Sequence, residues 1–289
     1  MVITQQQAVE SFSPIFKGFW GGLLFKTALA VTGIDNVNAT HQRLEDLGVE
    51  PGPDFAKGIL DDVGVDFRIG NAKRLENLPE GPFIAIANHI YGHLDGIALV
   101  DILGHVRPKT KVMVNEFLMW IHGLAPCFIS VNPTTTEKKS ATATSINGVK
   151  SALLQIRSGE PLALFPSGAV ADWKPRKGRT VLEERDWQEA ALKLIRKAKV
   201  PVVPIHFPDH NSWFYYGLGL IDYRVRFVRL FHELFNKRGT HPRMIIGETI
   251  SADNLAAIPE EGFGTFLRKS VYEMPDEGNY TLRSNLWKK

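Results

Sequence analysis

The sequence contains only one cysteine, Cys127, among 289 residues, and a single thiol excludes an intramolecular disulfide framework. Its neighbours in residues 125–129 are mostly apolar, so we expect a buried structural thiol and not a nucleophile. The first ten residues are polar and lack the basic start and short apolar core of a cleavable signal peptide. These absences favour a reducing, cytoplasmic setting.

The chain also lacks a large charge imbalance. The 34 basic and 31 acidic side chains give a formal net charge of +3 and a pI near 8.9. This excess is too small to indicate nucleic-acid binding, so no nucleic-acid partner is expected, but it is compatible with an anionic membrane surface.

A third absence is an uninterrupted hydrophobic run. Residues 12–37 are the most apolar part of the N-terminus, but Lys17, Lys26 and two adjacent glycines break the stretch of about 20 apolar residues that a transmembrane helix needs. Apolar side chains recur there at helical spacing: Phe12, Ile15, Phe16, Phe19 and Leu23. This stripe predicts an amphipathic helix, which either lies in the membrane interface or packs on the protein's own core.

Hydrophobic residues make up 44% of the chain, enough for the core of one large α/β domain with or without a small appendage. Short helices are expected at residues 41–47 and 53–62, so residues 1–64 are predicted to form an N-terminal helical, membrane-associating subdomain. From residue 65 to residue 289, strand and helix patterns alternate, which predicts an α/β domain with a mixed, mostly parallel sheet flanked by helices. The expected strands are 65–69, 82–87, 111–114, 127–131, 161–165, 200–207, 223–230 and 244–250, and the expected helices begin near 93, 117, 134, 183 and 263. Two prolines should confine the 200–207 strand to a sheet edge, or lie at its terminus.

The stretch from residue 82 to residue 96 carries the strongest chemical signal. A short apolar run stops abruptly at Asn88-His89, and a helix is expected to begin near Asp95. This spacing lets His89 meet Asp95 across a turn. A histidine titrates near neutral pH and can take a proton from a hydroxyl, while a carboxylate on its other nitrogen fixes the tautomer. The plainer alternative is that His89 caps the helix and Asp95 supplies a first-turn charge.

A second candidate turn follows the expected strand at residues 161–165. The sequence Pro166-Ser167-Gly168 predicts a tight turn whose backbone amides could bind an anion or a developing oxyanion, although an ordinary turn fits equally well. Basic residues follow at Lys174, Arg176, Lys177 and Arg179. Such a run is usually a solvated loop, but beside a site it could hold a phosphate or carboxylate. The aromatic cluster at residues 213–216 belongs either to the core or to a second membrane contact.

Four of these segments together resemble a known family. Asn88-His89 with Asp95, Phe128-Ile129, Phe165-Pro166-Ser167-Gly168 and Val200-Pro201-Val202-Val203-Pro204 occur in the order of the four motifs of the glycerolipid, or lysophosphatidic acid, acyltransferase superfamily. The resemblance covers roughly residues 67–207.

The chain departs from the usual family pattern at three places. Five residues separate His89 from Asp95 where members of the family usually have four, and Phe165 begins Phe-Pro-Ser-Gly-Ala-Val where Phe-Pro-Glu-Gly-Thr-Arg is usual. The arginine expected near Phe128-Ile129 is also absent. With these departures the chain resembles the hemolysin-like branch of the superfamily, which includes the O-acyltransferases of bacterial ornithine and glycine lipids.

The resemblance implies transfer of a fatty acyl group from acyl carrier protein or acyl-CoA to the hydroxyl of a lyso-lipid, with no cofactor and no metal. The implied acceptor is a monoacylated amino-acid lipid of the glycine or ornithine type. The alternatives are a lysophosphatidic acid or lysophospholipid acyltransferase of phospholipid synthesis, and a non-catalytic lipid-binding protein of the membrane surface. The implied location is peripheral, on the cytoplasmic face of the cell membrane.

The resemblance also assigns roles to residues. His89 would be the base and Asp95 its orienting partner, with His93 as the alternative base. Acceptor or oxyanion binding would fall to Ser167 and Gly168 of the third motif and, on the chemistry of the basic run that follows it, to Lys174 and Arg176. Two weaker readings are a metal hydrolase, with His206 joining the two histidines and Asp95 as ligands, and a serine hydrolase that uses Ser167 without the usual flanking glycines.

Overall fold

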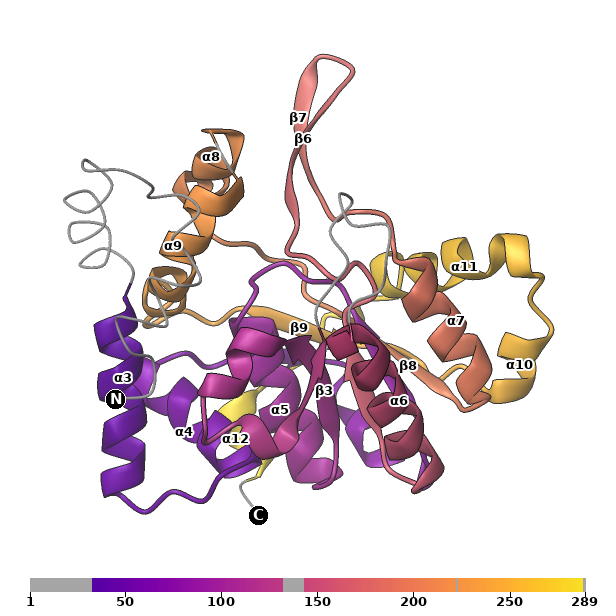
Figure 1. The fold of residues 1–289 in the computed structure, drawn as a ribbon, viewed down its shortest axis with the longest axis horizontal. Coiled ribbons are helices and arrows are strands. Elements are labelled where there is room, and N and C mark those ends of the chain that lie inside the picture. Colours follow the sequence, from indigo (N-terminus) through magenta and orange to yellow (C-terminus); the bar gives the residue numbers. More distant parts are fainter. Residues whose placement is uncertain (1–32, 132–142, 222, 288–289) are drawn as a thin grey trace.

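The computed structural model describes residues 33–131, 143–221 and 223–287 of the chain (Figure 1). Most of the predicted amphipathic stretch at 12–37, and the expected start of a helix at residue 134, lie outside these residues. None of the helices in the described part is long and apolar enough to cross a bilayer.

Within the described residues the chain folds around an eight-stranded sheet with the strand order β10-β1-β9-β8-β2-β5-β3-β4. Five of the seven strand pairs are parallel, and the two pairs β1/β10 and β8/β9 are antiparallel. The strands are β1 (Arg68–Gly70), β2 (Ile84–Ala87), β3 (Lys111–Asn115), β4 (Phe128–Val131), β5 (Leu162–Leu164), β8 (Val202–His206), β9 (Arg243–Ile246) and β10 (Tyr280–Leu282). The predicted fold class, a mixed and mostly parallel α/β sheet flanked by helices, is confirmed.

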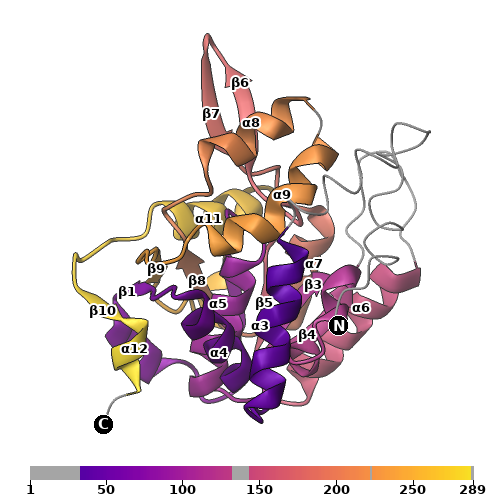
Figure 2. The same cartoon turned by 90° about the vertical axis from the view of Figure 1, so that its left-hand side faces the viewer.

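Helices cover both faces of this sheet (Figures 1 and 2). They are α3 (Ile34–Asp46), α4 (Pro53–Val63), α5 (Leu94–Val106), α6 (Ala143–Arg157), α7 (Glu189–Ala198), α8 (Trp213–Ile221), α9 (Tyr223–Phe235), α10 (Ala252–Ala256), α11 (Glu260–Tyr272) and α12 (Arg283–Leu286). Three shorter 3-10 helices are η1 (Ala72–Asn77), η2 (Glu116–Trp120) and η3 (Ala125–Cys127).

The central strand β2 shows how the two layers form. Its side chains alternate between the faces, as strand geometry requires. Ala85 and Ala87 pack into the core that also contains α4 and α5, whereas Ile84 and Ile86 pack into the core formed with α6, α7 and α11. Every residue of β2 is buried, so the strand delivers the segment that follows it to a fixed place at the carboxyl edge of the parallel sheet, where ligands bind in open α/β folds.

The N-terminal helices share a core with the α/β part of the chain. Leu44 of α3 and Leu60 of α4 belong to the same cluster of buried side chains as Leu99 of α5. The predicted division into residues 1–64 and 65–289 stays a prediction.

Three sequence predictions about the fold are wrong. Residues 223–230 alternate like a strand but form the first turns of the helix α9, because Leu230 and Leu234 recur at helical spacing and both are buried. The basic run after residue 172 is not a loop but a hairpin, β6 (Asp172–Arg176) and β7 (Arg179–Glu183), joined by Lys177 and Gly178. Both linking residues have positive φ angles of 42° and 82°, as a two-residue hairpin turn requires.

The third wrong prediction concerns the two prolines of residues 200–207, which were expected at a strand terminus or on an edge strand. Pro201 does lie just before β8, but Pro204 lies inside it. β8 lies inside the sheet, between β2 and β9. The sheet tolerates Pro204 because its ring nitrogen faces β9 just where that antiparallel ladder ends. The carbonyl of Pro204 accepts from the amide of Gly247, which is the residue after β9, so the missing N–H removes no bond from the parallel ladder with β2.

Candidate active site

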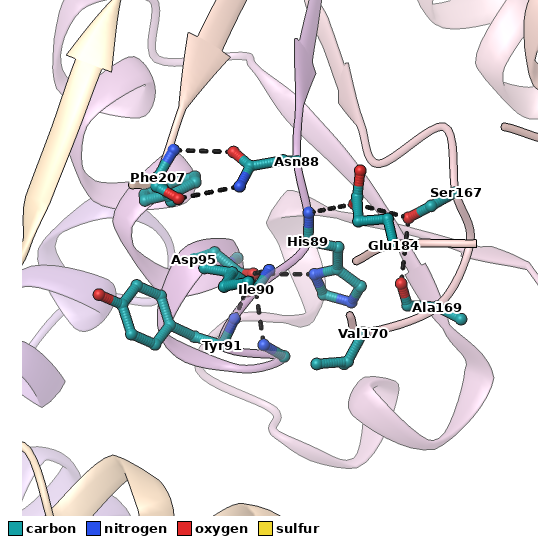
Figure 3. Close-up of polar contacts among 12 residues, drawn as sticks. Asn88, His89, Ile90, Tyr91, Asp95, Ser167, Ala169, Val170, Glu184 and Phe207 are labelled. Carbon is teal, nitrogen blue, oxygen red and sulfur yellow. Dashed lines mark hydrogen bonds and ion pairs between the residues drawn. The ribbon is translucent and has the colours of Figure 1, made fainter. Parts of the chain in front are cut away.

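The turn after β2 and the first turn of α5 place His89 against Asp95 (Figure 3). The imidazole Nδ1 lies 2.9 Å from Asp95 Oδ2. Because an ionised carboxylate can only accept, Nδ1 carries the proton and Nε2 keeps its lone pair. The His89 side chain is 16% exposed to solvent and stacks on Phe165 with a ring-centroid distance of 4.1 Å.

Asp95 is completely buried and surrounded by donors. Its Oδ2 also accepts from the amides of Ile90, Tyr91 and Gly92, and its Oδ1 accepts from the amide of Gly96. Burial opposes ionisation, but the His89 imidazole and these amides outweigh it and hold the pKa of Asp95 below its ordinary value. Asp95 is therefore a carboxylate that fixes both the His89 ring and the loop that carries it.

Asn88 anchors the other side of the same loop. Its side-chain amide donates to the carbonyl of Phe207 at 2.9 Å, and its side-chain oxygen accepts from the Phe207 amide at 2.7 Å. Phe207 follows β8, the strand that pairs with β2. The loop is thus tied to the neighbouring strand by two hydrogen bonds that involve no other side chain.

The turn after β5 lies beside His89 (Figure 3). Gly168 has a φ of +63°, and its amide donates to the Phe165 carbonyl, which closes the turn. The amide of Gly168 is therefore committed within the turn, whereas the amides of Ala169 and Val170 donate to no acceptor among the described residues. The backbone amide of Ala171 donates a hydrogen bond of 2.8 Å to the His89 carbonyl, which joins this turn to the loop that carries His89.

A buried glutamate that the sequence did not single out connects the two turns. One carboxylate oxygen of Glu184 accepts from the His89 backbone amide and lies 2.8 Å from Ser167 Oγ. Its other oxygen accepts from Trp187 Nε1 at 3.3 Å and from Tyr272 Oη at 2.6 Å. Burial and the negative charge of Glu184 raise the pKa of Tyr272, so this phenol stays a donor. The carboxylate of Glu184 thus lies against Ser167, the residue that stands where the family motif has its glutamate.

A cavity of about 360 Å³ opens beside His89. Its lining includes residues 166 and 168–170 of the turn after β5, together with the polar side chains of Gln188 and two arginines. Most of the wall is apolar and comes from α5, β3, the segment at residues 118–128 and α7, including Ile97, Val114, Leu118, Ile121, Leu124, Phe128, Ala191 and Leu194. This cavity has the size and lining that suit a ligand with one polar and one apolar end.

The two predicted acceptor cations lie away from this cavity. Lys174 donates to the backbone carbonyl of Glu184 at 2.7 Å, and Arg176 pairs with Glu183 across the hairpin. Among the described residues, the cations that line the cavity are Arg226 and Arg185. Arg226 is buried, donates to the carbonyls of residues 170 and 171, and forms an ion pair with Asp172. Arg185, in contrast, is exposed at the rim.

His93 also lines the cavity but differs from His89 in its surroundings. Its ring stacks on Phe231 at 4.5 Å, and burial lowers its pKa to about 4. Nε2 of His93 is buried without a hydrogen-bond partner in the described part of the chain. Asp95 directs its hydrogen bonds to His89 and not to His93.

The residues of the two weaker readings are not brought together. His206 packs against Tyr272 at a centroid distance of 5.5 Å and lines a different cavity. Among residues 33–131, 143–221 and 223–287, no three His, Cys, Asp or Glu side chains are grouped so as to hold a metal ion. Ser167 faces Glu184 and the Ala169 carbonyl, and no histidine bonds its hydroxyl.

Comparison with known proteins identifies the scaffold. Residues 35–278 match the model of a family described as "Acyltransferase". The chain belongs to this acyltransferase family. A lyso-glycine lipid O-acyltransferase of Bacteroides thetaiotaomicron is 30% identical over 201 residues, which cover 64% of this chain and 70% of that protein. A protein of the same name from Phocaeicola vulgatus is 29% identical over 213 residues, 68% of this chain and 72% of its own length. The predicted superfamily and the glycine-lipid branch are confirmed.

In this acyltransferase, then, the pairing of His89 with Asp95 could be predicted from a short stretch of sequence, whereas the place of Glu184 in the site could not. Glu184 appeared in the sequence only as one of several acids after the basic run. Its place beside His89 depends on the hairpin, which returns the chain to the site after residue 172.

Proposed function

We propose that this acyltransferase moves a fatty acyl group from the thioester of acyl carrier protein or coenzyme A to the hydroxyl of a monoacylated amino-acid lipid. The observation that carries the proposal is the pairing of His89 with Asp95 beside a cavity with an apolar body and a polar mouth. The names of the two relatives support a glycine-type acceptor.

The proposed reaction uses His89 as the general base. Nε2 of His89 removes the proton from the acceptor hydroxyl, whose oxygen attacks the thioester carbonyl, while Asp95 stabilises the imidazolium that forms. The amides of Ala169 and Val170 are the proposed donors to the tetrahedral oxyanion. Collapse of this intermediate forms the ester and expels the thiolate, which takes the proton back from the imidazolium. The step needs no metal and no covalent enzyme intermediate.

His93 is the less suitable base because its pKa near 4 makes it a weak proton acceptor at neutral pH. The apolar wall of the cavity is the proposed place for an acyl chain. We also propose that the enzyme works at the cytoplasmic face of the cell membrane as a peripheral protein.

A competition assay tests the acceptor. Purified enzyme is given one acyl thioester and equal amounts of lysophosphatidic acid and of an N-acyl glycine whose acyl chain bears a 3-hydroxyl. We expect the glycine lipid to be acylated preferentially, because a phosphate monoester calls for several charge-assisted donors and, among the described residues, the mouth of the cavity offers one exposed guanidinium. If lysophosphatidic acid is acylated at least as efficiently, the amino-acid-lipid assignment fails.

Arg185 is the proposed partner of the acceptor carboxylate, since it is exposed at the rim while Arg226 is already engaged. Arg185→Gln should raise KM for the glycine lipid by about 10- to 100-fold, the worth of one charge-assisted hydrogen bond pair, with a much smaller change in kcat. Arg157→Gln, which removes an exposed arginine from the end of α6, is the matched control and should leave KM unchanged. Equal effects of the two substitutions would exclude a specific role for Arg185.

A further inference from the structure

The helix α8 presents an apolar face to solvent. Trp213, Phe214 and Leu220 each retain 60% of their exposure. At 100° per residue these three side chains fall on one side of the helix. The nine residues of α8 include no charged side chain. A contiguous exposed apolar face of this kind marks a contact surface more often than a simple solvent boundary.

The opposite face of α8 packs on the wall of the active-site cavity. Tyr215 and Tyr216 are fully buried and form a cluster with Val170 and Leu230. Val170 and Leu230 themselves line the cavity. The buried face of α8 therefore packs on side chains that line the space beside His89, and its exposed face points the other way. The aromatic segment at residues 213–216 thus divides between the core and the surface, and does not belong wholly to either.

The β6–β7 hairpin adds positive charge beside this face. Trp173 of β6 contacts Trp213 with a ring-centroid distance of 5.4 Å, and both views show the hairpin and α8 projecting from the same side of the molecule (Figures 1 and 2). Lys177 and Arg179 are exposed at the hairpin tip. The charge of Arg176 is offset by Glu183, so the tip carries a net positive charge.

We propose that Trp213, Phe214 and Leu220, together with Lys177 and Arg179, form a docking surface for an anionic lipid bilayer. Tryptophan and phenylalanine suit the boundary between headgroups and acyl chains, and nearby lysine and arginine are attracted to anionic headgroups. A bilayer fits this pattern better than a protein partner, because α8 and the hairpin project from the same side of the molecule, with an uncharged apolar helix next to cations at the hairpin tip (Figures 1 and 2). The assignment rests on the proposed function in one respect: a lipid acceptor would leave the membrane next to the cavity that receives it.

Vesicle sedimentation with the full chain tests the surface. The double variant Trp213→Ser/Phe214→Ser should bind vesicles of phosphatidylethanolamine and phosphatidylglycerol at least about tenfold more weakly than the wild-type protein, since two large apolar side chains no longer enter the interface. The matched control is Ile146→Ser/Leu154→Ser on α6, whose side chains are 58% and 59% exposed on a part of the molecule remote from the hairpin (Figure 1). This control should bind like wild type. Equal binding by all three proteins would overturn the proposal.

The charges are tested separately. Lys177→Glu/Arg179→Glu should weaken binding to the anionic vesicles by roughly fivefold or more per charge but change binding to phosphatidylcholine vesicles little. An equal loss on both kinds of vesicle would contradict the electrostatic part of the proposal. All four residues are exposed, so thermal melting should show unchanged folding in both double variants.

An activity assay separates this proposal from the proposed function. Trp213→Ser/Phe214→Ser should turn over a short-chain, water-soluble acceptor at the wild-type rate and a vesicle-borne acceptor more slowly. If no lyso-lipid is acylated by the wild type, the proposed function fails while the sedimentation result still decides the docking surface. If the double variant instead loses binding to purified acyl carrier protein, or loses self-association, while its vesicle binding is unchanged, the face is a protein contact and the bilayer proposal is wrong.

Discussion

Replacing His89 by alanine is expected to lower kcat for acyl transfer by about 100- to 10,000-fold, the usual contribution of a positioned general base. The fold should survive, because the His89 ring is partly exposed and the backbone amides of the loop still donate to the carboxylates of Asp95 and Glu184. Steady-state rates with a saturating thioester, combined with a thermal melt of the same preparation, measure both quantities. KM should change little, since the lost interaction belongs to the transition state.

Two companion variants decide whether His89 is the right histidine. His93→Ala should lower stability by leaving a void beside Phe231, yet keep most of the turnover per folded molecule. Asp95→Asn should lower kcat by an amount comparable to His89→Ala or smaller, because the imidazole loses its tautomer-fixing partner. Activity that persists in His89→Ala and disappears in His93→Ala would show that the base is the buried histidine.

Glu184→Gln is expected to lower kcat by up to about 100-fold although Glu184 touches no substrate in the proposed reaction. The glutamine side chain has the same shape as the glutamate. Its NH₂ group, however, would face hydrogen-bond donors at whichever of the two carboxylate oxygen positions it occupied. The His89 backbone and the turn at Ser167 would shift relative to each other, and a displacement of about 1 Å is enough for a loss of this size. Glu184 is thus a positioning residue for the base and the oxyanion donors.

A swap variant distinguishes positioning from general destabilisation. Because Ser167 Oγ lies 2.8 Å from the Glu184 carboxylate, Ser167→Glu combined with Glu184→Ser returns a carboxylate to the same place and should recover kcat relative to Glu184→Gln. Glu183→Gln, which removes the neighbouring acid of the hairpin, is the control and should change kcat little. The positioning role is wrong if Glu184→Gln lowers only the melting temperature and leaves kcat unchanged, or if the swap recovers stability without rate.

The part of the site that the sequence predicted is the part that local geometry determines. His89 and Asp95 are six residues apart, and one turn between a buried strand and a helix start is enough to bring them together. The strands that carry the site could also be predicted, because short apolar runs bounded by glycine and proline indicate buried strands whatever their order in the sheet. The predicted contact could therefore be derived without knowing the strand order.

The rest depended on contacts between distant residues. Glu184 reaches His89 across 95 positions of the chain, and only the hairpin at residues 172–183 brings it back. That hairpin was hidden because its strands carry charges and a proline, which single-sequence patterns assign to loops. Arg226 illustrates the same limit: it lies in residues 223–230, which were predicted to form a strand, whereas in α9 it is buried and bonds two carbonyls and Asp172.

Lipid profiling of cells that lack this protein tests the central claim most directly. Mass spectrometry should show loss of a diacylated amino-acid lipid and accumulation of its monoacyl precursor. Expression of the wild-type chain should reverse both changes, and an equal level of His89→Ala should reverse neither. Unchanged amino-acid lipids, accompanied by a rise in lysophosphatidic acid and a fall in phosphatidic acid, would contradict the account and assign this enzyme to phospholipid synthesis.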